Sequence, residues 1–291
     1  MKNILIALLI LLLEHSHAQE QKLLFFQTNW GNNLSWDAFC DRAKKSGFDG
    51  IDVWLPSNQE SQDALKAALK KHNLLLNLMH GTNKSVPFKQ SLTQFEEKLK
   101  VMVQWNPVLI NCHTGSDFFT LEQNKAFIEI ANKISEESGI PIYHETHRGR
   151  FSYNLPDTKK YVSLIPDLKL TLDISHWMVV HESLLEDQNK SLEEIVDRSN
   201  HIHARVGHAE GPQVNDPAAP EWQKALDRHL DIWKQIIRKR WSEGQDVVTI
   251  TSEFGPPTYL PALPYTQIPV ADQWKANVFI MNALKKRMKI E

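Results

Sequence analysis

Acidic and imidazole side chains follow several short apolar runs of this sequence, and four of them suit a metal centre. They are Glu145, Asp173, His203 and Glu253, and each stands at the end of such a run. Carboxylates buried together are costly unless a cation lies between them. Three carboxylates with one imidazole suit Mn²⁺ or Mg²⁺, with Co²⁺ or Zn²⁺ as alternatives. The pattern predicts one divalent metal per chain, for which we favour Mn²⁺.

Two of these ligands are also the candidate catalytic groups. A divalent metal polarises a carbonyl and lowers the pKa of the neighbouring C–H, which leads to an enediolate. Glu145 and Glu253 would flank the substrate carbon, one removing a proton and the other returning it. Return to the opposite face is epimerisation, return to the neighbouring carbon is isomerisation, and loss of a β-leaving group is elimination. The sequence leaves these outcomes open.

Other polar and aromatic side chains at the ends of the same runs are candidate substrate contacts. They are His80, His113, His147, His176, Arg205 and Trp30. Trp30, Trp54 and Trp177 would either present flat faces to a sugar ring or pack at the rim of the site.

The neighbours of these candidates receive other roles. Asp52 stands at the end of another such run, and it would either join the group that converges on the site or cap the segment that follows it. His144 should face away from Glu145, because successive strand residues alternate between faces. A long irregular loop is predicted over 207–220, with Gln213 reaching from it into the pocket.

Strands alternating with helices must position these residues. The strands are predicted at Leu23–Thr28, Gly50–Trp54, Leu74–Met79, Val108–His113, Pro141–Glu145, Leu168–Asp173, His201–Ala204 and Val247–Glu253. Helical patterns cover Ser35–Lys45, Asp63–His72, Thr120–Glu137, Glu221–Trp241 and Ala271–Lys286. This alternation predicts a single (β/α)8 TIM barrel, whose strands end at one mouth where the active site lies. A doubly wound open sheet is the alternative, but no glycine-rich loop follows the first strand.

Composition excludes several classes of protein. The chain has 291 residues, 42% of them hydrophobic, which is enough for a large core. Its 33 Lys and Arg against 35 Asp and Glu lack the basic excess of nucleic-acid binders. Two cysteines, Cys40 and Cys112, cannot form a disulfide framework, and we interpret both as buried thiols.

The N-terminus has the features of a secretory signal. Lys2 precedes the apolar run Ile4–Leu13, which is too short to span a bilayer, and small residues at 16 and 18 follow it. We expect a signal peptide at 1–18 and a barrel domain at 19–291. The protein would then be exported, periplasmic or secreted, with no membrane contact after cleavage. An uncleaved anchor is the alternative.

Four strings of the sequence resemble the xylose-isomerase-like TIM barrels. They are Tyr143-His144-Glu145-Thr146-His147, Leu172-Asp173-Ile174-Ser175-His176, His201-Ile202-His203-Ala204-Arg205 and Thr251-Ser252-Glu253-Phe254-Gly255. This superfamily includes sugar isomerases and epimerases, the inosose enzymes and, more distantly, the apurinic-site endonucleases. The resemblance covers the whole chain after the signal.

The resemblance implies a role for several residues. Glu145, Asp173, His203 and Glu253 would be the metal ligands. His147 and His176 match positions that contact substrate oxygens. The epimerases carry an arginine six residues after the ligand that matches His203. This chain has Ala209 there, which leaves Arg205 as the substitute anchor.

Three classes of enzyme remain. The favoured one is a sugar isomerase or epimerase acting on an unphosphorylated keto- or aldo-sugar. The second is a lyase or hydrolase of keto-sugar glycosides, which export favours somewhat, because free sugar phosphates are not expected outside the cytoplasm. The third is a phosphodiesterase like the apurinic-site endonucleases, which place further zinc ligands near His80 and His113. Its downstream Asp-x-His pair has no convincing match, since Asp227-Arg228-His229 lies in a helical stretch.

A non-catalytic sugar-binding module is the remaining alternative, but binding alone would not require two ligand carboxylates placed as bases. The expected partner is therefore a small carbohydrate and not a nucleic acid. The sequence gives no oligomeric state.

Overall fold

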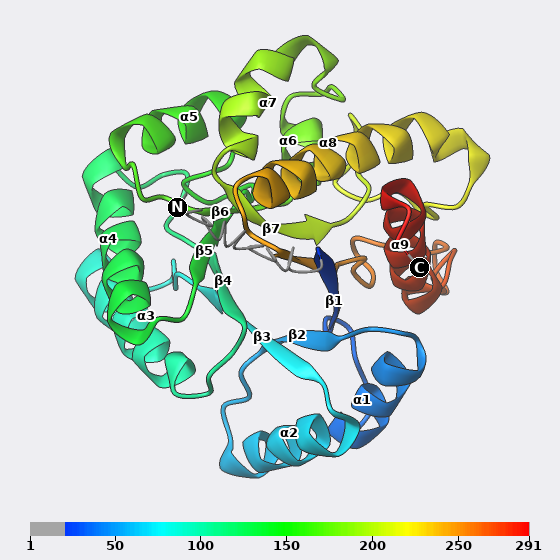
Figure 1. Cartoon of the computed structure of the whole chain (residues 1–291), viewed down its shortest axis with the longest axis horizontal. Coiled ribbons are helices and arrows are strands. Elements are labelled where there is room, and N and C mark those ends of the chain that lie inside the picture. Colours follow the sequence, from blue (N-terminus) through cyan, green and yellow to red (C-terminus); the bar gives the residue numbers. More distant parts are fainter. Residues whose placement is uncertain (1–20, 291) are drawn as a thin grey trace, which may run out of the picture.

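The structure is a computed structural model that describes residues 21–290. Eight parallel strands form a closed barrel in chain order, surrounded by helices (Figure 1). The strands are β1 Lys22–Thr28, β2 Gly50–Trp54, β3 Leu75–Gly81, β4 Leu109–His113, β5 Ile142–Glu145, β6 Leu170–Leu172, β7 Ser199–Ala204 and β8 Val247–Ser252. The predicted (β/α)8 barrel is confirmed, and each strand ends within two residues of its predicted bounds. The predicted signal peptide lies outside the described residues.

Nine α-helices lie among the described residues. They are α1 Trp36–Lys45, α2 Gln59–His72, α3 Phe88–Val103, α4 Leu121–Ser138, α5 Leu155–Leu164, α6 Ser175–Val180, α7 Asn189–Val196, α8 Gln223–Ser242 and α9 Gln273–Met288. Short 3₁₀ turns at Glu186–Gln188 and Pro220–Trp222 precede α7 and α8. The five predicted helices are present, and α3, α5, α6 and α7 fill the intervals whose bounds the sequence did not give.

Capping side chains set the ends of several helices. The Ser35 hydroxyl accepts from the amide of Ala38 and begins α1. Thr120 and Gln123 form a reciprocal capping box at the start of α4. Asn58 caps α2 by accepting from the amide of Ser61. Helix α2 therefore begins four residues before the predicted Asp63, which shows that the cap, not the apolar pattern, fixes its start.

Alternation along the strands divides the barrel residues into two sets. Outward-facing Ile51, Val53 and Ile110 are fully buried against the surrounding helices. Cys40 and Cys112 are free thiols in the same apolar layer, as predicted. The inward-facing set is polar near the carboxyl ends of the strands, which is where the candidate site residues lie.

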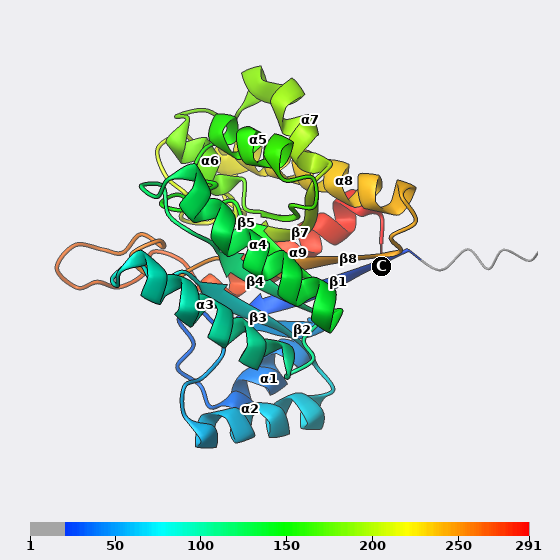
Figure 2. The same cartoon turned by 90° about the vertical axis from the view of Figure 1, so that its left-hand side faces the viewer.

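The mouth of the barrel lies at the carboxyl ends of the strands. The segment between β8 and α9 projects beyond this end as an extended loop, coloured orange in Figure 2. One residue of this loop, Tyr259, folds back to the mouth and lines the cavity there. Within residues 21–290, no helix has both the length and the apolar character needed to cross a membrane.

Candidate functional site

Three of the predicted metal ligands meet at the mouth of the barrel. Glu145 ends β5, His203 lies on β7 and Glu253 directly follows β8. The Nδ1 atom of His203 is 3.2 Å from Oε2 of Glu145 and 3.0 Å from Oε2 of Glu253. Glu145 and His203 are fully buried, and Glu253 is 5% exposed. Three donor atoms thus face one small volume from three strands.

Asp173 adjoins this group but belongs to an overlapping one, with Glu145 and His176. Its Oδ1 accepts from the amide and the hydroxyl of Ser175, at 2.9 and 2.6 Å. Its Oδ2 pairs with the guanidinium of Arg205. The structure therefore brings all four predicted ligands to the mouth, with Asp173 already bonded to a cationic side chain.

The donor set fits a divalent cation. Ligand atoms that share one cation at 2.0–2.2 Å lie about 3 Å apart, which is the spacing around Nδ1 of His203. In addition, Oε1 of Glu145 is buried and has no hydrogen-bond partner among the described residues. A buried carboxylate oxygen without a donor is costly, and a bound cation would satisfy it.

Electrostatics couple these residues. Burial lowers the pKa of His203, but the charges of Glu253 and Glu145 outweigh it and hold that pKa well above its usual value. Burial raises the pKa of Glu145, yet His113 and His203 hold it well below its usual range. Burial raises the pKa of Asp173 to about 6 although Arg205 opposes the shift. The two carboxylates thus favour the protonated form of His203, and a cation at its Nδ1 would compete with that proton.

A small cavity of about 210 Å³ opens onto this cluster. Aromatic and imidazole side chains form most of its wall. The lining residues are Thr28, Trp30, Trp54, Met79, His113, His147, Arg205, Glu253 and Tyr259. Such a wall combines apolar faces with a few hydrogen-bonding groups, as small-molecule sites do.

Three histidines stack in a row beside the cavity. The ring centroids of His113 and His147 are 4.5 Å apart, and those of His147 and His176 are 3.9 Å apart. Nε2 of His113 lies 2.9 Å from Oε2 of Glu145. Nε2 of His176 accepts from Arg205 at 2.8 Å. These predicted substrate contacts therefore connect the cavity to the carboxylates.

Arg205 lies among aromatic rings at the floor of the cavity. Its guanidinium carbon is 4.8 Å from the ring centroid of Tyr259 and 6.0 Å from that of Trp30. Trp30 in turn packs on Gly255, where a Cβ atom would come within 2.4 Å of the indole. Only a glycine allows this approach, so Gly255 permits Trp30 to line the cavity.

The structure does not bring three other predicted residues to the site. His80 faces outward, with Nε2 3.2 Å from the backbone carbonyl of Phe95 on α3. Trp177 is fully buried, and its Nε1 donates to the carbonyl of Ser152. The amide of Gln213 bonds to the backbone of Gly255 and does not line the cavity.

Sequence reasoning missed Asn111 and Tyr259 at this site and left Asp52 between two roles. Asn111 donates to Oε2 of Glu145 at 2.5 Å, and its place two residues before His113 on the same strand face was a usable signal. Asp52 is not a cap, because it points into the barrel beside His203. Tyr259 comes from the irregular loop after β8, where no periodicity predicts its position.

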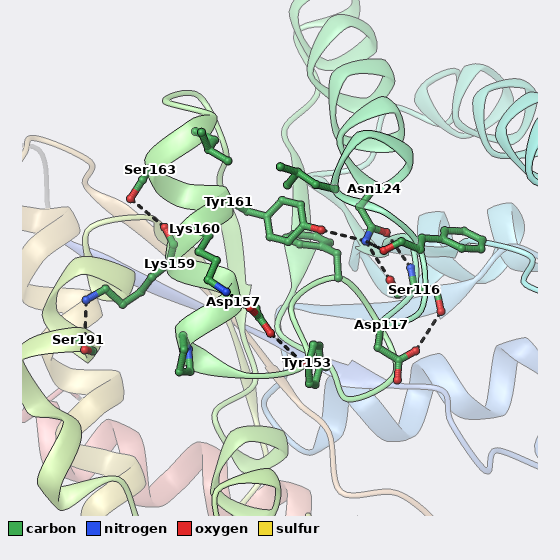
Figure 3. A pocket seen from close by; sticks show the side chains of 15 residues that line it. Ser116, Asp117, Asn124, Tyr153, Asp157, Lys159, Lys160, Tyr161, Ser163 and Ser191 are labelled. Carbon is green, nitrogen blue, oxygen red and sulfur yellow. Dashed lines mark hydrogen bonds and ion pairs between the residues drawn. The ribbon is translucent and has the colours of Figure 1, made fainter.

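A larger cavity of about 870 Å³ lies away from these ligands, between α4 and α5 (Figure 3). Its polar groups bond to one another. Asn124 donates to the Tyr161 hydroxyl, and both Tyr153 and Lys160 donate to Asp157. Size alone therefore does not make it the candidate site, since its polar side chains are already paired.

Comparison with known proteins places the chain in a family. The family model described as "Xylose isomerase-like TIM barrel" matches residues 40–238, and the chain belongs to this family. No curated protein sequence matches the chain.

Solved structures with the same fold come from proteins of different function. The 3-keto-D-glucoside 4-epimerase of E. coli is 16% identical, with a TM-score of 0.62 over 91% of this chain and 100% of that one. A xylose isomerase-like TIM barrel protein of Mycobacterium smegmatis, in complex with magnesium, is 11% identical, with a TM-score of 0.58 over 93% and 99%. Endonuclease IV of Thermus thermophilus is 13% identical, with a TM-score of 0.54 over 91% and 98%. These likenesses establish the fold.

Proposed function

We propose that this protein is a divalent-metal-dependent sugar isomerase or epimerase that acts through an enediolate on an unphosphorylated keto- or aldo-sugar. The observation that carries the proposal is the buried group of Glu145, His203 and Glu253 beneath a cavity lined by aromatic and imidazole side chains. The epimerase among the structures of this fold supports it.

Glu145, His203 and Glu253 would hold one metal ion, with Asp173 as the fourth ligand. When bound, this ion would supply a Lewis acid that stabilises the negative charge developing on the substrate carbonyl oxygen. We favour Mn²⁺, because three carboxylates and one imidazole form a hard site with some nitrogen character. The magnesium complex of a protein with this fold supports a hard divalent ion.

The carboxylates also supply the proton chemistry. Glu253 lines the cavity and would exchange a proton with one face of the substrate carbon. Glu145 would serve the other face. Its Oε2 accepts from Asn111 and lies beside Nε2 of His113, so a proton can pass between carboxylate and imidazole.

The other lining residues would bind and orient the sugar. His113 and His147 offer ring nitrogens to substrate hydroxyls, with His176 behind them. Arg205 offers a fixed cation, and Trp30 and Tyr259 offer apolar faces. Aromatic surfaces with a few hydrogen-bonding groups suit a sugar better than an extended polymer.

Charge favours an unphosphorylated substrate. Four carboxylates are buried at the mouth, those of Asp52, Glu145, Asp173 and Glu253. With His203 neutral as a ligand, they outnumber the charges of a divalent cation and Arg205. A phosphate dianion brought into this volume would be repelled. The same excess of negative charge would repel the phosphate backbone of a nucleic acid. The partner we propose is therefore a small carbohydrate.

We also propose that the protein is exported, to the periplasm or the medium, on the basis of the signal expected at residues 1–18. Export is consistent with a substrate that carries no phosphate.

Product analysis tests the proposed function. Protein stripped of metal and reloaded with Mn²⁺ is incubated with a panel of unphosphorylated keto- and aldo-sugars, and the mixture is followed by NMR. We expect at least one sugar to give a stereoisomer or a keto–aldo isomer, and EDTA to abolish the reaction. Cleavage of keto-sugar glycosides without isomerisation would favour the lyase or hydrolase. Cleavage of an abasic DNA strand with every sugar unchanged would overturn the proposal.

A further inference from the structure

A buried carboxylate lies on the side of the His203 ring that faces away from the proposed metal. Asp52 on β2 is 1% exposed, and its Oδ2 is 3.3 Å from Nε2 of His203. The other ring nitrogen, Nδ1, faces Glu145 and Glu253. The imidazole of His203 therefore has the two proposed ligand carboxylates, Glu145 and Glu253, beside Nδ1 and the carboxylate of Asp52 beside Nε2.

We propose that Asp52 is a positioning residue for the metal site. It accepts the Nε2–H of His203 and so leaves the Nδ1 lone pair free for the divalent cation. This inference rests on the proposed function, since it assumes that His203 is a metal ligand.

The hydrogen-bond inventory of the ring supports this assignment. A neutral imidazole carries one N–H, and the partner of one nitrogen decides which nitrogen is left for a metal. An ionised aspartate only accepts hydrogen bonds. The amide nitrogen of Asn111 is also 3.2 Å from Nε2 and bonds to Glu145 as well, but an amide NH2 group only donates and cannot accept the Nε2–H. Asp52 is therefore the group placed to receive the Nε2–H.

A second contact fixes the carboxylate. The hydroxyl of Thr251 on β8 donates to Oδ2 of Asp52 at 2.8 Å. Asp52, Thr251 and His203 come from three different strands of the closed barrel. The strands therefore hold both the acceptor and the ring, which restricts rotation of the imidazole before any ion arrives.

A purely structural role makes a different prediction from a positioning role. If Asp52 only fills the interior, its replacement by the isosteric asparagine changes stability and leaves metal affinity alone. If it positions His203, the amide group can offer its N–H to Nε2 and favour the tautomer with the proton on Nδ1. Metal affinity then falls, because that proton blocks the ligand atom.

Metal titration separates these two roles. Wild type and Asp52→Asn are stripped of metal and titrated with Mn²⁺ by calorimetry, and we expect a dissociation constant 10–100-fold higher for the variant. Asp49→Asn is the matched control. Its carboxylate accepts from the amide of Phe25 at 2.9 Å, at the opposite end of the same strands. We expect wild-type Mn²⁺ affinity for this control.

A spectroscopic measurement reads the tautomer itself. Long-range ¹H–¹⁵N spectra of the Zn²⁺-loaded protein should show the proton of His203 on Nε2. Thr251→Val is a second variant in case Asp52→Asn does not fold. It keeps the carboxylate but removes the hydroxyl that holds it, and we expect a smaller loss of Mn²⁺ affinity in the same direction.

These experiments distinguish a failure of the positioning role of Asp52 from a failure of the proposed function. If Asp52→Asn binds Mn²⁺ as tightly as wild type, the positioning role alone is overturned. If Asp52→Asn does not fold, the same result for Thr251→Val overturns it. A His203 proton on Nδ1 in the Zn²⁺-loaded wild type also overturns it. Wild-type protein that binds neither Mn²⁺ nor Zn²⁺ overturns this inference and the proposed metal site together.

Discussion

Nδ1 of His203 lies 3.0 Å from Oε2 of Glu253, and the two side chains come from neighbouring strands of the closed barrel. Both are buried, so their interaction is screened little by solvent. The Glu253 carboxylate favours the protonated imidazole and helps to hold the pKa of His203 well above its usual value. A cation bound between the two residues would compete with that proton, so both residues would belong to one metal site.

Glu253→Gln tests the role of this carboxylate. The change keeps the size of the side chain but removes a ligand charge and a candidate base together. We expect turnover to fall at least 10²–10⁴-fold, the usual loss for a positioned acid–base group, with weaker Mn²⁺ binding. Steady-state rates and metal content measure the two effects. Glu210→Gln, an exposed residue of the loop after β7, is the control and should keep both. Near-native rate and metal content in Glu253→Gln would make that residue structural.

Arg205→Lys tests the proposed substrate anchor. Arg205 bonds to Ser175, Asp173 and His176 through a fixed planar group. A lysine ammonium cannot reproduce these directions. Loss of one charge-assisted hydrogen bond costs about 1.5–3 kcal/mol, so we expect kcat/KM to fall roughly 10–100-fold.

The control for this change is Arg228→Lys. Arg228 donates to the carbonyls of Leu184 and Leu185, away from the cavity, and its replacement should leave kcat/KM unchanged. If Arg205→Lys matched this control, Arg205 would only neutralise Asp173.

The barrel and the ligand cluster were predictable because they depend on periodicity. A strand of known direction places every second residue inward, and parallel strands end at one mouth. Glu145, Asp173 and His203 could therefore be located without knowing a single contact. The same rule fails when the strand end is misplaced. His80 was placed at the mouth because its strand was predicted to end at Met79, whereas β3 continues to Gly81, Met79 lines the cavity and His80 faces α3.

Other features depend on partners that are distant in the chain. Asp52 is a plausible cap in isolation, and only barrel closure brings it to Thr251, 199 residues away. Tyr259 lies on an irregular loop whose path is set by tertiary contacts. The bounds of α3 and α5 were also missing from the sequence interpretation, since packing, and for α5 the Asn154 cap, decide where these helices begin.

His229→Gln tests a pH dependence of stability. His229 on α8 is fully buried, and its Nε2 accepts from the amide of Gly207 while Nδ1 faces the carbonyl of Ala225. Burial lowers the pKa of His229 to about 4, against 6.5 for an unperturbed histidine. The folded state therefore holds the neutral ring, and its contribution is complete above pH 6.5. It is lost as the pH falls towards 4, because the unfolded chain takes up the proton first.

The expected size follows from the shift. One pKa unit corresponds to 1.36 kcal/mol, so this histidine contributes on the order of 3 kcal/mol to the fall in the free energy of unfolding between pH 7 and 4. Urea titrations of wild type and His229→Gln across this range measure it. The glutamine does not titrate, so the variant should have the flatter profile. Parallel profiles would show that His229 is not held neutral.

The mature N-terminus tests the proposed export. The apolar run and the small residues at 16 and 18 predict cleavage before Gln19. Intact mass of the protein recovered from its native host should correspond to a chain that begins at this residue. A species that retains Met1 would contradict the prediction and favour an uncleaved segment.

Deuterium incorporation tests the proposed mechanism. An enediolate forms only if the hydrogen on the carbon next to the carbonyl leaves, so that position must exchange with solvent. Mn²⁺-loaded protein incubated with its sugar substrate in D₂O should place deuterium at this carbon, as read by NMR and mass spectrometry. Glu145→Gln and Glu253→Gln should both suppress the exchange, because each carboxylate is proposed to serve one face of the substrate.

Two further measurements distinguish this mechanism from the alternative mechanisms. A chelator should stop the exchange, because without a cation the negative charge that develops on oxygen lacks its main stabilisation. The lyase alternative shares the exchange step, but it would also release a leaving group from a glycoside. A phosphodiesterase breaks no C–H bond. Isomerisation without any deuterium uptake would point to a hydride shift and would remove the base roles of Glu145 and Glu253.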